Sequence, residues 1–156
     1  MGQEEHPDSL PLFVTDEERL ARAIFFPNYV NKRGKLKPSA FKAPGGRQDV
    51  SVNRLLALDA NACKARSMAI TLSGTFKGFA VLTAHAVREC GSDVKDSRAA
   101  YLGHADIIHD QILPKNEPPP PEFNERLKRM VEAAHYFPDP APETDTWTGD
   151  DFSAGH

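Results

Sequence analysis

Two short, almost wholly apolar runs and one strongly amphipathic segment constrain the fold of this chain more than any other feature. Residues 79–84 read Phe-Ala-Val-Leu-Thr-Ala, and residues 103–109 read Gly-His-Ala-Asp-Ile-Ile-His. Short runs of this kind are typical of central strands. From Phe123 onward, apolar residues recur at i, i+4, i+7, i+8 and i+11, which predicts a helix over 121–136 with one apolar stripe. We expect the core to form where this helix covers the two strands.

The first part of the chain allows two interpretations. Thr15 and Glu18 fit the capping-box pattern, which predicts a short helix ending near Phe26, because the following Pro27 disfavours helical backbone before it. A strand through residues 22–26 is the alternative, since that stretch is rich in residues that favour strands.

Capping and turn signals divide the rest of the chain into shorter elements. They predict an extended stretch over 36–41, a short strand over 49–55, a helix over 60–72 begun by Asp59, and a turn of helix over 85–90 closed by Gly91. This order of elements indicates an α+β domain. We predict a small, mostly apolar sheet of three to five strands packed by two or three helices.

The length of 156 residues fits one domain. We expect an N-terminal arm over 1–14, a single α+β domain over 15–138, and a disordered acidic tail over 139–156, where only Trp147 and Phe152 are large apolar residues. No apolar run approaches the roughly 18 residues that a membrane span needs, which argues against a membrane partner. Two cysteines are too few for a disulfide framework, so we expect a cytoplasmic protein.

Charge is distributed unevenly along the chain. The net charge is −4 over residues 1–27 and −8 over residues 89–156, whereas residues 28–88 carry +9, from eleven basic and two acidic side chains. Its densest part holds Lys32, Arg33, Lys35, Lys37, Lys42 and Arg47. Such asymmetry indicates an anionic partner for the basic segment 28–88. The alternative is that the acidic ends fold over the basic segment and neutralise it.

One candidate site is therefore a binding surface. In this hypothesis Lys35, Lys37, Lys42 and Arg47 supply charge to a non-catalytic binding domain, while Tyr29 and Phe41 supply contact area. The partner would be an acidic protein surface or a nucleic acid. No signature of a common nucleic-acid-binding domain accompanies these residues, and we expect no cofactor.

The second candidate site is catalytic. In a strand, His104 and Asp106 share one face, so the carboxylate can orient the imidazole for acid–base work. Arg22, Ser51 and Arg54 can hold a phosphate, which predicts a small enzyme acting on a nucleotide or RNA, of a transferase-like or nuclease-like toxin type. The histidines and cysteines do not follow metal-ligand spacing, so we expect no metal, and no glycine-rich phosphate loop occurs.

Short motifs spread over residues 19–110 carry a resemblance to other proteins. They are Arg22-Ala-Ile, Gly34 with Ser39-Ala-Phe41, Asp49-Val-Ser-Val52, Phe79 to Ala84, and Gly103-His-Ala-Asp-Ile107. In these the chain resembles a group of small bacterial proteins that has no assigned reaction. The resemblance implies a bacterial, cytoplasmic, single-domain protein.

A second resemblance is to small ADP-ribosyltransferase-like toxins, which use an arginine on an early strand, a serine in mid-chain and a late glutamate. Arg22 and Ser51 match the first two positions. The strand over 103–110 carries no glutamate; His104 and Asp106 stand there instead. This departure puts the transferase reaction in question.

Overall fold

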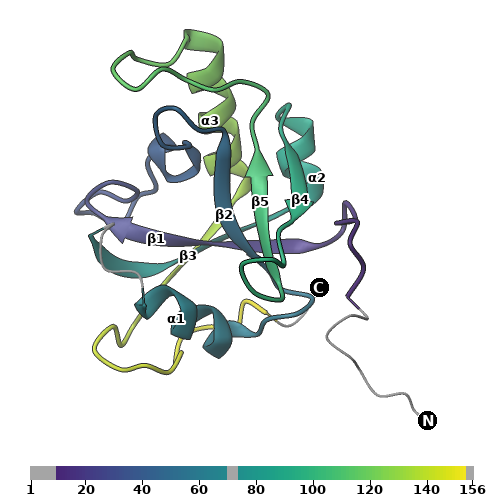
Figure 1. Ribbon diagram of the computed structural model, residues 1–156. Helices are drawn as coiled ribbons and strands as arrows, with labels where there is room; N and C mark the ends of the chain where they lie inside the picture. The colour runs from purple at the N-terminus through teal and green to yellow at the C-terminus, as the bar shows by residue number, and fades with distance from the viewer. Residues whose placement is uncertain (1–9, 70–73, 154–156) are drawn as a thin grey trace.

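The computed structural model describes residues 10–69 and 74–153, and it shows six strands in one antiparallel sheet. The elements, in chain order, are β1 (Arg19–Phe26), the 3-10 helix η2 (Pro38–Phe41), β2 (Asp49–Arg54), α1 (Ala60–Met68), β3 (Thr75–Thr83), α2 (Ala84–Glu89), β4 (Asp93–Asp96), β5 (His104–Ile108), α3 (Pro121–Ala133) and β6 (His135–Pro138). The strand order is β4-β5-β2-β1-β3-β6 (Figure 1). The α+β class is confirmed, with six strands in place of the three to five predicted.

The two strands missing from the prediction are the edges of the sheet. β4 contains one buried apolar residue, Val94, and β6 occupies residues that continue the apolar stripe of α3. An edge strand pairs along one side only and needs little apolar surface, so its sequence pattern is weak.

The region before β2 also differs from the sequence prediction. Thr15 to Glu18 form a turn in which the Glu18 carboxylate accepts a hydrogen bond from the Thr15 amide, as in a capping box, but the chain then continues as strand β1. The predicted short helix is therefore wrong, and the alternative of a strand through residues 22–26 is confirmed. Pairing with β3 along eight residues outweighs the local helical signal. The stretch predicted as extended contains η2 instead, with Pro38 in its first turn, where the missing N–H costs nothing.

The sheet is split between β1 and β2. β1 pairs with β3 from Arg19 to Phe26, but it pairs with β2 only at Leu20 and Ala21. β2 in turn pairs with β5 over its first five residues. Figure 1 shows β2, β5 and β4 running steeply across the direction of β1 and β3. From Arg22 onward, the edges of β1 and β2 therefore diverge.

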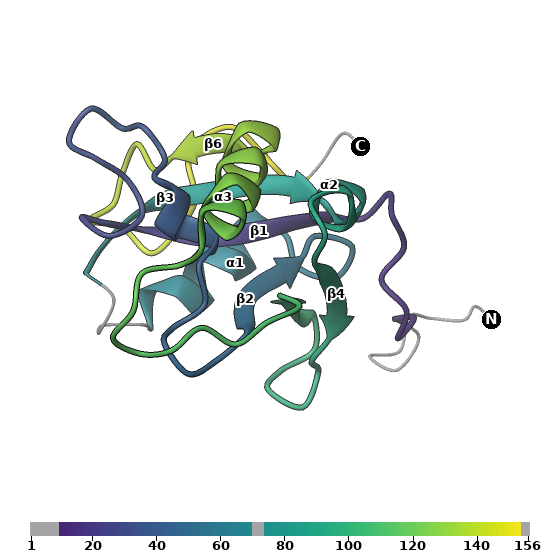
Figure 2. The same cartoon turned by 90° about the horizontal axis from the view of Figure 1, so that it is seen from above.

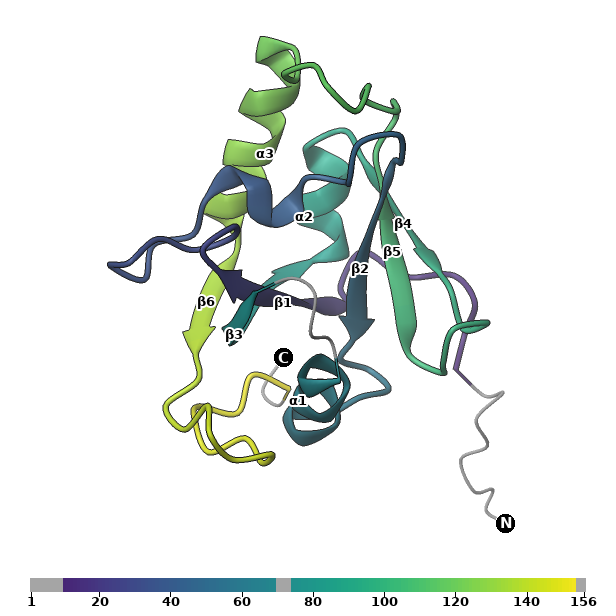
Figure 3. The ribbon, with the colours of Figure 1, turned by 60° about the vertical axis from the view of Figure 1, so that its left-hand side comes forward.

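Each face of the sheet has its own core. Helices α2 and α3 cover one face, as Figure 2 shows from above, and bury Phe123, Leu127 and Met130 against the strands. This confirms the amphipathic helix predicted from the sequence, although α3 ends at Ala133 and residues 135–136 of the predicted helix belong to β6. Asp59 begins α1 as predicted, accepting a hydrogen bond from the Ala62 amide, and α1 covers the opposite face (Figure 3).

The C-terminal segment completes the second core. Trp147 and Phe152 are buried against Phe79, with ring centroids 5.7 and 4.9 Å away. Residues 139–153 therefore differ from the disordered tail that we predicted, because two aromatic rings bury enough apolar surface to order a polar segment. The predicted arm over 1–14 and the end of the helix predicted over 60–72 lie partly outside the described residues. Among those that are described, no helix has the length and apolarity to cross a bilayer.

Candidate functional site

A cavity of about 360 Å³ opens where β1 and β2 diverge. Its walls come from β1, β2, α1 and the residues before β5, and we call it the β1–β2 cleft. The lining includes side chains that can bind a ligand or react with it, namely Arg22, Tyr29, Ser51, Asn53, Arg66, Tyr101 and His104. Three of the residues proposed for the catalytic site, Arg22, Ser51 and His104, are thus brought together from three strands.

Ser51 and His104 form a hydrogen-bonded pair in the cleft. The Ser51 hydroxyl oxygen lies 3.0 Å from His104 Nε2, and His104 Nδ1 lies 3.3 Å from the Ser97 carbonyl oxygen. A carbonyl can only accept, so the neutral ring carries its hydrogen on Nδ1 and leaves Nε2 as an acceptor for the hydroxyl of Ser51. This is the arrangement in which a histidine can take a proton from a hydroxyl group.

Asp106 lies beside this pair but does not orient the ring. Its Oδ1 atom is 4.0 Å from His104 Nε2, on the side of Ser51, whereas the Ser97 carbonyl contacts Nδ1. The orienting role predicted for Asp106 is thus filled by the Ser97 carbonyl. Burial raises the pKa of the Asp106 carboxyl, against the lowering effects of His104 and the Ser97 hydroxyl. A raised pKa favours the neutral acid, which can donate a hydrogen bond.

Arg22 reaches across the gap between the diverging strands. Its Nε atom donates to the Ala40 carbonyl at 2.8 Å, its Nη1 atom donates to the Ser51 carbonyl at 3.1 Å, and its guanidinium lies 4.8 Å from the centre of the Tyr29 ring. Burial lowers the pKa of Arg22, partly offset by Tyr29. The described part of the chain gives Arg22 no carboxylate as an ion-pair partner. The cleft therefore contains a fixed cation with donors left for an anion.

Three further cleft residues escaped the sequence analysis. The Tyr101 hydroxyl donates to the Asn53 side chain, and the Arg66 guanidinium lies 3.9 Å from the centre of the Tyr101 ring. The Tyr101 ring also contacts His104 edge-on, at 5.0 Å between centroids. Asn53 shares a strand face with Ser51 and was therefore detectable, whereas nothing in the sequence places Tyr101 and Arg66 beside it.

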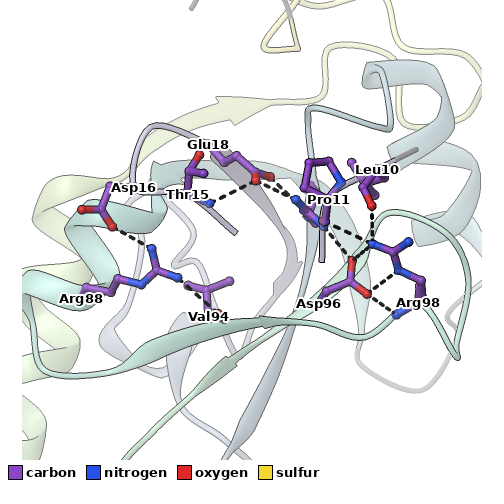
Figure 4. A network of polar contacts seen from close by, with 10 residues as sticks. Leu10, Pro11, Thr15, Asp16, Glu18, Arg88, Val94, Asp96 and Arg98 are labelled. Carbon is purple, nitrogen blue, oxygen red and sulfur yellow. Dashed lines mark hydrogen bonds and ion pairs between the residues drawn. The ribbon is translucent and has the colours of Figure 1, made fainter. Parts of the chain in front are cut away.

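Arg54 does not belong to the cleft. Its side chain is fully buried and donates to both oxygens of Glu18, to Asp96 and to the Pro11 carbonyl. Arg98 also binds Asp96, and it donates to the carbonyls of residues 10 and 11 (Figure 4). Arg54 is therefore not placed to hold a phosphate in the cleft as we predicted, because its charge is neutralised inside the fold.

The basic segment 28–88 is partly neutralised by the acidic ends of the chain. Ion pairs join Arg54 to Glu18 and Asp96, Lys64 to Asp139, and Arg88 to Asp16 and Asp93. This agrees with the alternative interpretation of the charge pattern, in which the acidic ends of the chain neutralise the basic segment.

The residues predicted for a binding surface are dispersed. Phe41 is fully buried in the core, Tyr29 lies in the cleft, and Arg47 pairs with Asp49. Lys42 is half-buried, and the Lys37 ammonium group donates to the Pro27 carbonyl. The exposed positive charge that is left gathers on the loop over residues 31–37, including Lys35. The binding hypothesis is therefore a proposal for this loop and its neighbours, not for the whole segment.

No family model, curated protein or solved structure matches this chain. Within residues 10–69 and 74–153, no three His, Cys, Asp or Glu side chains gather as ligands of a metal ion would. We therefore infer function from the geometry of the cleft and from the charges around it.

Proposed function

We propose that the β1–β2 cleft binds a nucleotide and that His104 and Ser51 carry out transferase-type chemistry on it. The observation that carries this proposal is the Ser51–His104 hydrogen bond of 3.0 Å inside a cavity that also holds the uncompensated cation of Arg22. Arginine donors suit a phosphate group, and the rings of Tyr29 and Tyr101 suit a base or a sugar face.

The positions of these residues support the transferase type over other nucleotide chemistry. The resemblance to ADP-ribosyltransferase-like toxins concerns an arginine on an early strand, a serine in mid-chain and a late glutamate. In this chain Arg22 is on β1, Ser51 on β2, and His104 with Asp106 on β5. We propose that the β5 pair takes the place of the missing glutamate, with His104 as the group that contacts the substrate.

The cleft can supply three parts of a group transfer. Arg22 would hold the phosphates of the nucleotide and fix its register against β1 and β2. His104 Nε2 would accept the proton of the attacking hydroxyl group while the new bond forms and the leaving group departs with its electron pair. The Ser51 hydroxyl would keep the ring in place through its hydrogen bond, or pass the proton to it.

Calorimetric titration with NAD, ADP-ribose and AMP tests binding, and chromatography of NAD incubations tests cleavage. We expect ADP-ribose and NAD to bind, and Arg22→Met to weaken binding by roughly 10- to 100-fold, since a charged hydrogen bond contributes about 1.5–3 kcal/mol. His104→Asn should keep binding and abolish turnover.

Two matched variants serve as controls. Arg129→Met and His85→Asn make the same changes at exposed positions on α3 and α2, and neither should alter binding or turnover. Nucleotide binding that survives Arg22→Met unchanged would contradict the proposed site, as would the absence of binding to all three nucleotides.

A further inference from the structure

A second cavity, larger than the cleft, lies on the other side of the loop that follows β1. Its volume is about 580 Å³, and its lining comes from the loop, β3 and β6. We call it the basic groove, and define it by Phe26, residues 30–34, Lys77, Tyr136, Pro138 and Asp139. The proposed catalytic chemistry makes no use of these residues.

The free charge of the basic groove is positive. Lys32, Arg33 and Lys77 line it, and all three are exposed. Its one acidic residue, Asp139, has a fully buried carboxylate 2.9 Å from the Lys64 ammonium group, so that charge is compensated inside the protein. Lys35 is exposed on the same loop and adds to the positive field. Among the described residues that line the groove, an anionic ligand therefore meets three cations and no uncompensated carboxylate.

Two aromatic rings line the groove together with these cations. The Lys77 ammonium group lies 5.9 Å from the centre of the Phe26 ring, and the Tyr136 hydroxyl donates to the Lys77 carbonyl at 3.2 Å. Both rings are half-buried and line the groove. Proteins that bind single-stranded nucleic acids combine cations that contact the phosphate backbone with aromatic rings on which the bases stack. An acidic peptide would use the cations and leave the rings without a role.

We propose that the basic groove binds a single-stranded nucleic acid, with Lys32, Arg33 and Lys77 on its phosphates and Phe26 and Tyr136 against its bases. Tyr29 lines the cleft and Val30, the next residue, lines the groove, so the two cavities are separated by the backbone of one loop. The groove is defined by its own residues, and its binding does not depend on chemistry in the cleft.

Fluorescence anisotropy with a labelled single-stranded RNA of about 12 nucleotides tests the proposal. Phosphate contacts with three cations predict that the logarithm of affinity falls with the logarithm of salt concentration with a slope of about −2. The triple variant Lys32→Ala, Arg33→Ala, Lys77→Ala should lose most of this slope and at least tenfold in affinity at low salt. An abasic strand of equal length should bind about fivefold more weakly than the RNA, because it cannot stack.

The matched control removes the same charges elsewhere. A second triple variant combines Lys115→Ala, Lys128→Ala and Arg129→Ala, at exposed positions outside the groove. It should leave the affinity for the RNA within about twofold of the wild type. Equal losses in both triple variants would overturn the proposal, as would equal affinity for the abasic strand or for polyglutamate. Arg22→Met should bind the RNA as the wild type does, so a failure of the cleft proposal and a failure of this one give different results.

Discussion

Arg22 and Arg54 lie on neighbouring strands, and both reach into the protein, but their surroundings differ. The guanidinium of Arg54 is fully buried and meets the carboxylates of Glu18 and Asp96. Burial lowers the pKa of Arg54, but hydrogen bonds with these two acids raise it more, so its charge is compensated. Arg22 is held by two backbone carbonyls and the face of Tyr29, which fix its position and leave its charge uncompensated.

This difference separates a structural cation from one that is free to act. A compensated buried charge contributes little to binding a further anion, and its removal leaves its partners buried and unpaired. A cation positioned by neutral acceptors keeps its attraction for an anion. The contrast also explains why net charge along the sequence does not tell which basic side chains are free to bind an anion.

The largest expected effect is on stability, from Arg54. Arg54→Met should lower the free energy of unfolding by about 3–5 kcal/mol, because it leaves the buried Glu18 carboxylate without its ion-pair partner and leaves Asp96 with Arg98 alone. Arg22→Met removes two hydrogen bonds to backbone carbonyls but no ion pair of the described residues, and should cost about 1–2 kcal/mol. Urea denaturation of both variants measures this difference. Equal losses of unfolding free energy would show that the two arginines contribute equally to stability, against this expectation.

Acid should weaken the ion-pair network that contains Arg54 and Asp96. Burial raises the pKa of Asp96, but hydrogen bonds from Arg98 and Arg54 outweigh it and hold that pKa below its ordinary value of 3.8. A lowered carboxyl pKa gives stability that is present above pH 3.8 and is lost as the pH falls through the folded-state pKa.

The variant Arg98→Gln sharpens this comparison. In this variant the free energy of unfolding should fall less steeply between about pH 4 and pH 2, by up to roughly 1 kcal/mol per pH unit. The reason is that Asp96 then takes up its proton nearer the pKa of the unfolded state. Urea midpoints measured across this range test the expectation. An unchanged pH dependence would mean that Arg98 does not set the pKa of Asp96.

The smallest effect is expected from the exposed pair of Arg47 and Asp49. The Arg47 side chain is 63% exposed, and ion pairs in such positions contribute at most about 1 kcal/mol. Arg47→Gln should therefore change the free energy of unfolding at pH 7 by less than about 0.5 kcal/mol. A loss as large as that of Arg54→Met would mean that burial does not distinguish the two arginines.

The sequence was sufficient to predict that Arg54 lies outside the cleft. Successive side chains of a strand point to opposite faces, so Ser51 and Arg54, three residues apart, cannot share one. The side chains of Val50 and Val52 pack in the core that α3 covers and Arg54 is buried in its ion-pair network, while the Ser51 and Asn53 side chains line the cleft. The same rule correctly placed His104 and Asp106 on one face, and put His109, which is buried against Phe41 and Ser92, on the other.

Local patterns by themselves determined most of the central and helical elements. Apolar runs located β3 and β5, the amphipathic stripe located α3, and Asp59 located the start of α1. These signals depend on neighbours within a few residues, so they can be read along the chain. The edge strands and the ordering of residues 139–153 were missed, since their stability comes from partners far away in the sequence.

Only the tertiary structure decided which charges are compensated and which residues meet in the cleft. Arg54 finds its carboxylates 36 and 42 residues away, and Ser51 meets His104 across 53 residues. Composition and spacing say which charges and hydroxyls exist, but Coulomb attraction and hydrogen bonding depend on distance and burial after folding. The sequence therefore determined the candidates for the site, and the divergence of β1 from β2 decided which of them lie together.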